Sequence, residues 1–219
     1  FLGQTIFPKS DIYLCKANIP EEMLATMGYA LDEDLVKEYE IDYVPIKGSG
    51  ISCKIASSKM FTYSKISVSN FNKIFGDSVL GAGASIFVPG DDIKLNNNVL
   101  NAWNVSEKEF LKFIDLIPGI SPHHNTNTLT ETEWSKIKNY CNNNIANTIR
   151  TKPEIGEMIF TGKGLFDDPY YAPLLFSHGT IKANTMPDKF NITTGSGRHK
   201  GKFTIVVKPL SYTQYENFN

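Results

Sequence analysis

The stretch Ile46-Lys-Gly-Ser-Gly-Ile-Ser-Cys-Lys-Ile55 joins a glycine-rich turn to a short apolar segment that carries one lysine. A phosphate-binding loop of the Walker kind needs four residues between its glycines and then Gly-Lys-Ser/Thr entering a helix. That spacing is absent here, and the residues after Gly50 have the branched character of a strand. The stretch therefore predicts two paired strands, at 41–46 and 50–56, around a turn at Lys47-Gly-Ser-Gly50.

The segments on either side predict a mixture of helices and strands. Two capping boxes, Ser106-Glu-Lys-Glu109 and Thr130-Glu-Thr-Glu133, each predict the start of a helix. The second helix is expected to run to about Ile149. The apolar stripe of this second helix is expected in the core and comprises Trp134, Ile137, Cys141, Ile145 and Ile149. Trp103, the other tryptophan of the chain, is expected there too.

The remaining elements are predicted from their residue composition and from the glycine, proline and asparagine residues that separate them. Helices are expected at 19–27, 32–39 and 69–76, and strands at 11–17, 60–66, 157–161, 174–177, 180–183 and 203–208. This mixed order predicts the α/β or α+β class, with a central mixed β-sheet flanked by helices.

Composition favours one globular domain over residues 1–219, because 41% of the 219 residues are hydrophobic and 21% are charged. The apolar runs are far shorter than the roughly 20 residues that a membrane helix needs, so no membrane partner is expected. Three widely spaced cysteines argue against a disulfide framework and favour a reducing cytoplasm. The chain begins Phe-Leu-Gly rather than Met, which leads us to expect a preceding N-terminal segment.

A net charge of −1 hides an uneven distribution of charges. Residues 21–42 hold eight acids against Lys37, whereas residues 179–208 hold six bases against Asp188. A basic end can bind a polyanion such as DNA. On charge alone, however, ordinary solvated surfaces are the favoured explanation for both stretches.

Three residues could together support cleavage of a phosphodiester. Such chemistry needs an acid to hold Mg²⁺ and a lysine to stabilise the developing negative charge or to orient water. Ser52 and Lys54 are two apart on the predicted strand and so face the same way, with Cys53 toward the core. Asp11 would be brought beside them by a neighbouring strand. A lysine pointing to solvent is the structural alternative for Lys54.

Pro8-Lys-Ser-Asp11 followed by Gly50-Ile-Ser-Cys-Lys54 resembles the PD-(D/E)xK signature of Type II restriction endonucleases, most closely those of the HpaII/MspI type. Ala56-Ser-Ser-Lys-Met-Phe61 and Asn191-Ile-Thr-Thr-Gly-Ser-Gly-Arg-His-Lys200 resemble further segments of such enzymes. The resemblance covers roughly residues 7–76 and 190–208. It departs from the signature at Ser52, which stands in place of the second acid.

The resemblance implies an Mg²⁺-dependent, sequence-specific endonuclease that acts on double-stranded DNA as a monomer or homodimer. Asp11, Ser52 and Lys54 would be catalytic, with Asp11 binding the metal and Asp42 as the candidate for the missing second carboxylate. Residues 1–118 would form the catalytic core, and residues 119–219 would recognise DNA and complete the sheet. The implied DNA contacts are Ser58, Lys59, Thr194, Ser196, Arg198, His199 and Lys200.

Other functions stay open at this point. A serine in place of the second acid also fits a DNA-binding or regulatory module that keeps the fold without catalysis, and an interbacterial nuclease toxin is a third reading. Histidines supply a further candidate general base, in the loop at His123 and His124 or at His178. Adjacent histidines seldom bind one ion, so no zinc site is expected there.

Overall fold

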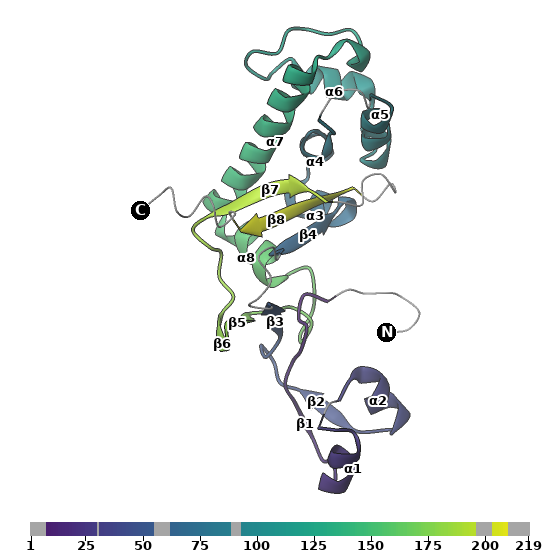
Figure 1. Ribbon diagram of the computed structural model, residues 1–219, viewed down its shortest axis with the longest axis vertical. Coiled ribbons are helices and arrows are strands. Elements are labelled where there is room, and N and C mark those ends of the chain that lie inside the picture. Colours follow the sequence, from purple (N-terminus) through teal and green to yellow (C-terminus); the bar gives the residue numbers. More distant parts are fainter. Residues whose placement is uncertain (1–7, 30, 55–61, 89–92, 196–202, 210–219) are drawn as a thin grey trace. The chain divides into compact units, whose positions relative to one another are not determined.

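The computed structural model describes residues 8–29, 31–54, 62–88, 93–195 and 203–209 (Figure 1). The chain divides into two compact units. The first comprises Phe1–Ala56 and Thr161–Thr185, and the second comprises Ser57–Phe160 and Met186–Asn219. The described part of the chain mixes helices with three small sheets, which confirms the predicted mixed class of fold. The strands form these three sheets and not one central sheet.

The first unit contains a two-stranded ribbon and two short acidic helices. Strands β1 (Cys15–Ala17) and β2 (Tyr43–Pro45) pair in antiparallel fashion, and helices α1 (Glu21–Thr26) and α2 (Glu33–Glu38) lie between them in sequence. Asp32 caps α2, because its Oδ1 accepts hydrogen bonds from the backbone N–H groups of Asp34 and Leu35. Both helices begin with acids, as the sequence predicts.

A second sheet of the first unit contains the strand that follows the glycine-rich turn. Strand β3 (Ile51–Lys54) pairs in parallel with β5 (Leu174–Ser177), which pairs in antiparallel fashion with β6 (Thr180–Ala183). The predicted pairing of 41–46 with 50–56 is therefore wrong. The Ser49 hydroxyl accepts from Leu14 N at 2.9 Å and donates to Ile46 O at 2.6 Å, which binds the turn to the segment before β1. β2 is thereby paired with β1, and β3 is left to pair with β5.

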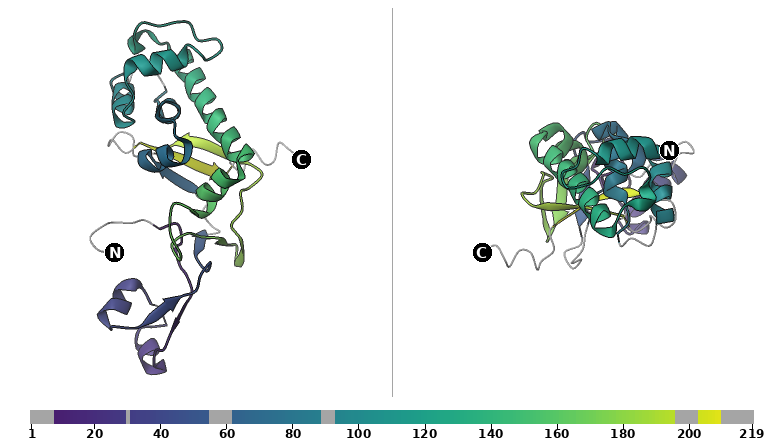
Figure 2. Two further views of the ribbon diagram at one scale, coloured as in Figure 1. Left: turned by 180° about the vertical axis from the view of Figure 1, so that it is seen from behind. Right: turned by 90° about the horizontal axis from the view of Figure 1, so that it is seen from above.

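The second unit is built on an antiparallel sheet in the order β4-β8-β7. Its strands are β4 (Ser64–Ser67), β7 (Phe190–Thr194) and β8 (Thr204–Pro209), and its helices are α3 (Val68–Phe75), α4 (Ser78–Ser85), α5 (Ile93–Ala102), α6 (Glu107–Ile114), α7 (Glu131–Thr151) and α8 (Pro153–Thr161), with a 3₁₀ turn at Thr126–Thr128. α7 runs from beside α6 to beside β7, and the view from behind shows the same course (Figure 1 and Figure 2).

Local signals account for most of the helix ends. Both predicted capping boxes are formed, and Gly76 ends α3 in the left-handed conformation. The strand predicted at 157–161 is instead part of α8. Pro153 at the first position favours a helix there, because its missing N–H needs no partner in the first turn. No helix in the described part of the chain is both long and apolar enough to cross a membrane.

The core of the second unit contains the predicted apolar stripe. All five stripe residues of α7 are buried, as are both tryptophans. α4 approaches this core closely through two glycines: a Cβ on Gly81 would lie 2.1 Å from the Trp103 ring, and one on Gly83 would lie 2.4 Å from Cys141 Sγ. The small residues of α4 therefore give the space that the large side chains fill.

The α7 capping box makes the stability of the second unit depend on acid pH. Hydrogen bonds from the Thr130 backbone N–H and then from His123 lower the pKa of Glu133 to about 2. Because this folded pKa lies below the unfolded value of about 4.3, the stabilisation is complete above pH 4.3 and is lost as the pH falls toward 2.

We therefore expect Glu133→Gln to lower the free energy of unfolding by about 1 kcal/mol at pH 7. The loss should be much smaller near pH 2, where about half of the wild-type carboxylate is protonated. Urea unfolding at the two pH values measures this difference. Glu131→Gln, in the same helical turn, is the control and should have little effect. An equal loss at both pH values would show that the Glu133 charge is not responsible.

Candidate functional site

The backbone places Asp11 beside the start of β3. The N–H groups of Asp11 and Ile12 both donate to Ile51 O, at 2.8 and 3.2 Å, and Ile51 N donates back to Ile12 O at 2.7 Å. Ile12 and Ile51 thus form an antiparallel bridge. This bridge holds the residues of the Pro8-Lys-Ser-Asp11 motif against the strand that carries Ser52 and Lys54.

The Asp11 carboxylate is fixed by two hydrogen bonds from β3. Its Oδ2 accepts from Cys53 N at 2.6 Å and from Ser52 Oγ at 3.2 Å. Asp11 itself is exposed, whereas Ser52 is only 2% exposed. No hydrogen bond within the described residues involves the other oxygen, Oδ1. The carboxylate therefore has a defined orientation and one oxygen left for a ligand.

Burial along β3 differs from the sequence prediction. Ile51 and Ser52 are buried, while Cys53 and Lys54 are half-buried. The prediction that Cys53 faces the core is therefore wrong. The chain is tightly packed just before the strand, where a Cβ on Gly50 would lie 2.0 Å from Tyr171 O and 2.7 Å from Pro169 O. The start of β3 is enclosed for this reason, and its end is more open.

Lys9 interacts with Asp11 and with Lys54, and the sequence predicts Lys54 as a site residue but not Lys9. Burial and then the positive charge of Lys54 lower the pKa of Lys9 to about 8, although the negative charge of Asp11 opposes both effects. Lys9 N donates to Tyr170 O at 2.9 Å, and a Cβ on Gly162 would lie 2.8 Å from Lys9 Cβ. Lys9 is thus tightly packed. Its place in the same Pro8-Lys-Ser-Asp11 motif is the sequence feature that could have identified it as a site residue.

Two of the other predicted site residues, Asp42 and Thr194, belong to the described part of the chain, and each has other surroundings. Asp42 is exposed and lines a shallow hollow with Lys16, Ala17 and Asn18, at the opposite end of β1. Thr194 is buried in β7, and its hydroxyl donates to Ala84 O at 3.1 Å, so it serves the packing of the second unit. The remaining predicted DNA contacts lie outside the described residues: Ser58, Lys59, Ser196, Arg198, His199 and Lys200.

Two of the three histidines considered as general bases, His123 and His178, have local partners. His123 Nδ1 lies 2.7 Å from Thr128 Oγ1, and its Nε2 lies 3.0 Å from Glu133 Oε1. His178 Nδ1 lies 2.8 Å from the hydroxyl of Ser177. His123 therefore links a loop to the first turn of α7.

The residues around Asp11 fit a magnesium ion that keeps much of its water. Within the described ranges, no three His, Cys, Asp or Glu side chains cluster as metal ligands. Mg²⁺, however, is commonly bound through one or two carboxylates, with waters and substrate phosphate oxygens completing its shell. An exposed carboxylate with one oxygen unoccupied by hydrogen bonds meets that requirement.

Comparison of this chain with protein-family models, with curated proteins and with solved structures gave no match.

Proposed function

We propose that this chain is an Mg²⁺-dependent, sequence-specific double-stranded DNA endonuclease of the Type II restriction kind. The observation that carries the proposal is the contact between Asp11 and Ser52. These residues are 41 positions apart, yet the Asp11 carboxylate is hydrogen-bonded to the strand that carries Ser52 and Lys54. A carboxylate next to a strand lysine is the arrangement that the resemblance implies.

Each residue of the proposed site has a distinct task. Asp11 would bind the metal through its oxygen Oδ1, and Ser52 would hold the carboxylate in place by donating to Oδ2. When bound, Mg²⁺ polarises the phosphate and lowers the pKa of a coordinated water. Lys54 would stabilise the additional negative charge on the phosphate oxygens or orient the attacking water.

Lys9 adds a second positive charge to the proposed site. Its pKa is influenced by both Asp11 and Lys54, so the three charged groups lie close enough to interact. Two lysines beside one carboxylate leave a net positive charge at this place when all three are ionised. Such a charge favours the approach of a DNA phosphate.

The finer features of the proposal rest on the resemblance. We propose that the sheet β3-β5-β6, with the Asp11 segment, corresponds to part of a restriction-endonuclease core. The proposed DNA contacts remain Ser58, Lys59, Ser196, Arg198, His199 and Lys200, without Thr194 because its side chain is buried. A palindromic target would suit a homodimer, and a monomer is the alternative. A bacterial cytoplasmic location fits such an enzyme.

A second candidate is a DNA-binding or regulatory module without catalysis. It is favoured by the serine at position 52, where the signature has its second acid, because a single carboxylate from the protein holds metal less strongly than two. A nuclease toxin of low sequence specificity is the third candidate. The three candidates differ in what they do to the same DNA.

Incubation with a mixed-sequence plasmid separates these candidates. We expect discrete fragments with Mg²⁺ and intact plasmid with EDTA. A smear of fragments would favour the toxin. A gel shift without cleavage would favour the non-catalytic module, and neither cleavage nor a shift would contradict all three.

A further inference from the structure

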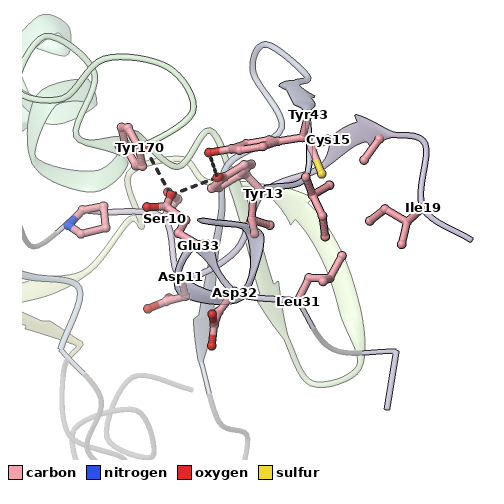
Figure 3. Close-up of a pocket in the computed structure, with 14 residues that line it drawn as sticks. Ser10, Asp11, Tyr13, Cys15, Ile19, Leu31, Asp32, Glu33, Tyr43 and Tyr170 are labelled. Carbon is pink, nitrogen blue, oxygen red and sulfur yellow. Dashed lines mark hydrogen bonds between the residues drawn. The ribbon is translucent and has the colours of Figure 1, made fainter. Parts of the chain in front are cut away.

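The first unit contains a pocket of about 440 Å³ that shares Asp11 with the proposed nuclease site but whose other lining residues have no part in that chemistry (Figure 3). It lies between the β1–β2 ribbon and α2, and Asp11 is at its edge. Its size is within the range of small-molecule sites. Every residue that lines it belongs to the first unit.

Strand alternation explains which side chains line the pocket. Tyr13, Cys15 and Ala17 are two apart and project to one side of the ribbon, where they line the pocket together with Tyr43. The intervening Leu14 projects to the other side and is 55% exposed. The pocket wall is thus a regular consequence of the sequence, and α2 contributes the opposite wall with Glu33 and Val36.

A half-buried carboxylate forms the polar centre of the pocket. Glu33 Oε1 accepts hydrogen bonds from the hydroxyls of Tyr13, at 3.0 Å, and Tyr170, at 3.2 Å (Figure 3). Tyr43 Oη lies 3.5 Å from the Tyr13 hydroxyl, and the Tyr13 and Tyr170 rings meet edge to face. Burial, and then the Glu33 charge, raise the pKa of Tyr170 to about 12, so this phenol remains a donor at neutral pH.

The pocket has negative charge and apolar surface together. Its carboxylates are Asp11, Asp32 and Glu33, and no lysine, arginine or histidine is among the described residues that line it. The hydrogen bonds of Glu33 use Oε1 alone, which leaves Oε2 without a hydrogen bond in the described part of the chain. Leu31, Val36 and the three tyrosines supply apolar and aromatic surface. On the α2 side of the pocket, Asp32 and Glu33 would repel a phosphate or other anion.

We propose that this pocket binds a small organic cation: an ammonium, amidinium or guanidinium group on a flat or short apolar body. The cationic group would pair with Glu33 Oε2, and the body would lie on the tyrosine rings and on Leu31 and Val36. Carboxylate and aromatic rings both attract such a cation, and the apolar wall favours it over a hydrated metal ion. The proposal requires neither DNA nor catalysis, so it does not rest on the proposed nuclease function.

Titration with benzamidine, followed by amide and tyrosine NMR signals, tests this proposal. The neutral isostere benzamide is the matched ligand control. We expect benzamidine to shift signals from the β1–β2 ribbon and α2, and benzamide to bind at least about tenfold more weakly, because a charged pair is lost. Absence of benzamidine binding, or equal binding of the two ligands, would overturn the proposal.

Two protein variants complete the test. Glu33→Gln is expected to weaken benzamidine about 10- to 100-fold, whereas Glu38→Gln, on the same helix but outside the pocket, should leave it unchanged. Leu31→Lys changes a 38% exposed side chain at the pocket and should weaken binding at least about tenfold through charge repulsion. If Glu33→Gln does not fold, the affinity of Leu31→Lys for benzamidine alone tests the proposed site. Unchanged affinity in a folded variant of either kind would contradict the proposed site.

Discussion

Asp11→Asn is expected to reduce the rate of DNA cleavage by at least about a thousandfold, which corresponds to the several kcal/mol that a catalytic metal contributes. Asparagine has nearly the shape of aspartate, and its carbonyl oxygen can still accept from Cys53 N and Ser52 Oγ. The fold around β3 should therefore be kept, while the negative charge that binds Mg²⁺ is removed. Initial rates of supercoiled plasmid loss measure the effect.

Two further variants make this result specific. Lys54→Met keeps much of the aliphatic side chain without its charge and should also reduce cleavage strongly, with DNA binding less affected. Asp42→Asn removes an equally exposed carboxylate at the other end of β1 and should cleave like the wild type. If Asp11→Asn and Lys54→Met both cleaved at the wild-type rate, the assigned site would be wrong even if the protein is a nuclease.

Gly50→Ala is expected to destabilise the first unit by about 3 kcal/mol, at the upper end of the usual cost of overpacking. The added Cβ would lie 2.0 Å from Tyr171 O and 2.7 Å from Pro169 O. Both are backbone atoms, so no side-chain rotation relieves the clash. Gly50 O also accepts the hydrogen bond from Leu174 N that begins the β3–β5 pairing, at 3.2 Å. Urea unfolding followed by tyrosine fluorescence measures the loss.

Gly156→Ala is the matched control for this substitution. Gly156 lies within α8, and an added Cβ would come no closer than 3.3 Å to another residue. Alanine in a helix should change the free energy of unfolding by no more than about 1 kcal/mol. A Gly50→Ala protein as stable as the wild type would show that the chain before β3 is less crowded than described.

The sequence predicts elements whose signals are local. Both capping boxes and the α7 stripe depend on residues within a few positions of one another, and all are confirmed. Strands β5 and β6 were predicted with their observed bounds, because apolar segments are separated there by His178-Gly179, which both have positive φ.

Strand pairing could not be predicted from local signals. The partner of β3 is β5, more than a hundred residues further along the chain, and nothing near Gly50 identifies it. The glycine-rich turn was assigned to a hairpin for the same reason. Helix α4 was missed because two of its residues, Gly81 and Gly83, are poor helix formers, and their role becomes visible only against the large side chains they contact.

The candidate site was predicted in part. The order and spacing of two motifs suggested that Asp11 and Ser52 meet, and the structure shows their hydrogen bond. The contribution of Lys9 and the pocket around Glu33 were missed. Lys9 packs against Gly162 and donates its backbone N–H to Tyr170 O. Glu33 accepts hydrogen bonds from the hydroxyls of Tyr13 and Tyr170. Residues that the fold gathers from distant segments leave no pattern in the sequence.

Sequencing the ends of DNA fragments tests the central claim most directly. A plasmid library is incubated with the protein and Mg²⁺, and the positions of all new ends are read. The proposed function predicts that the ends fall at one short sequence, with the same offset on both strands, and that Asp11→Asn produces none. Ends scattered over unrelated sequences, or the same ends from the Asp11→Asn protein, would contradict it.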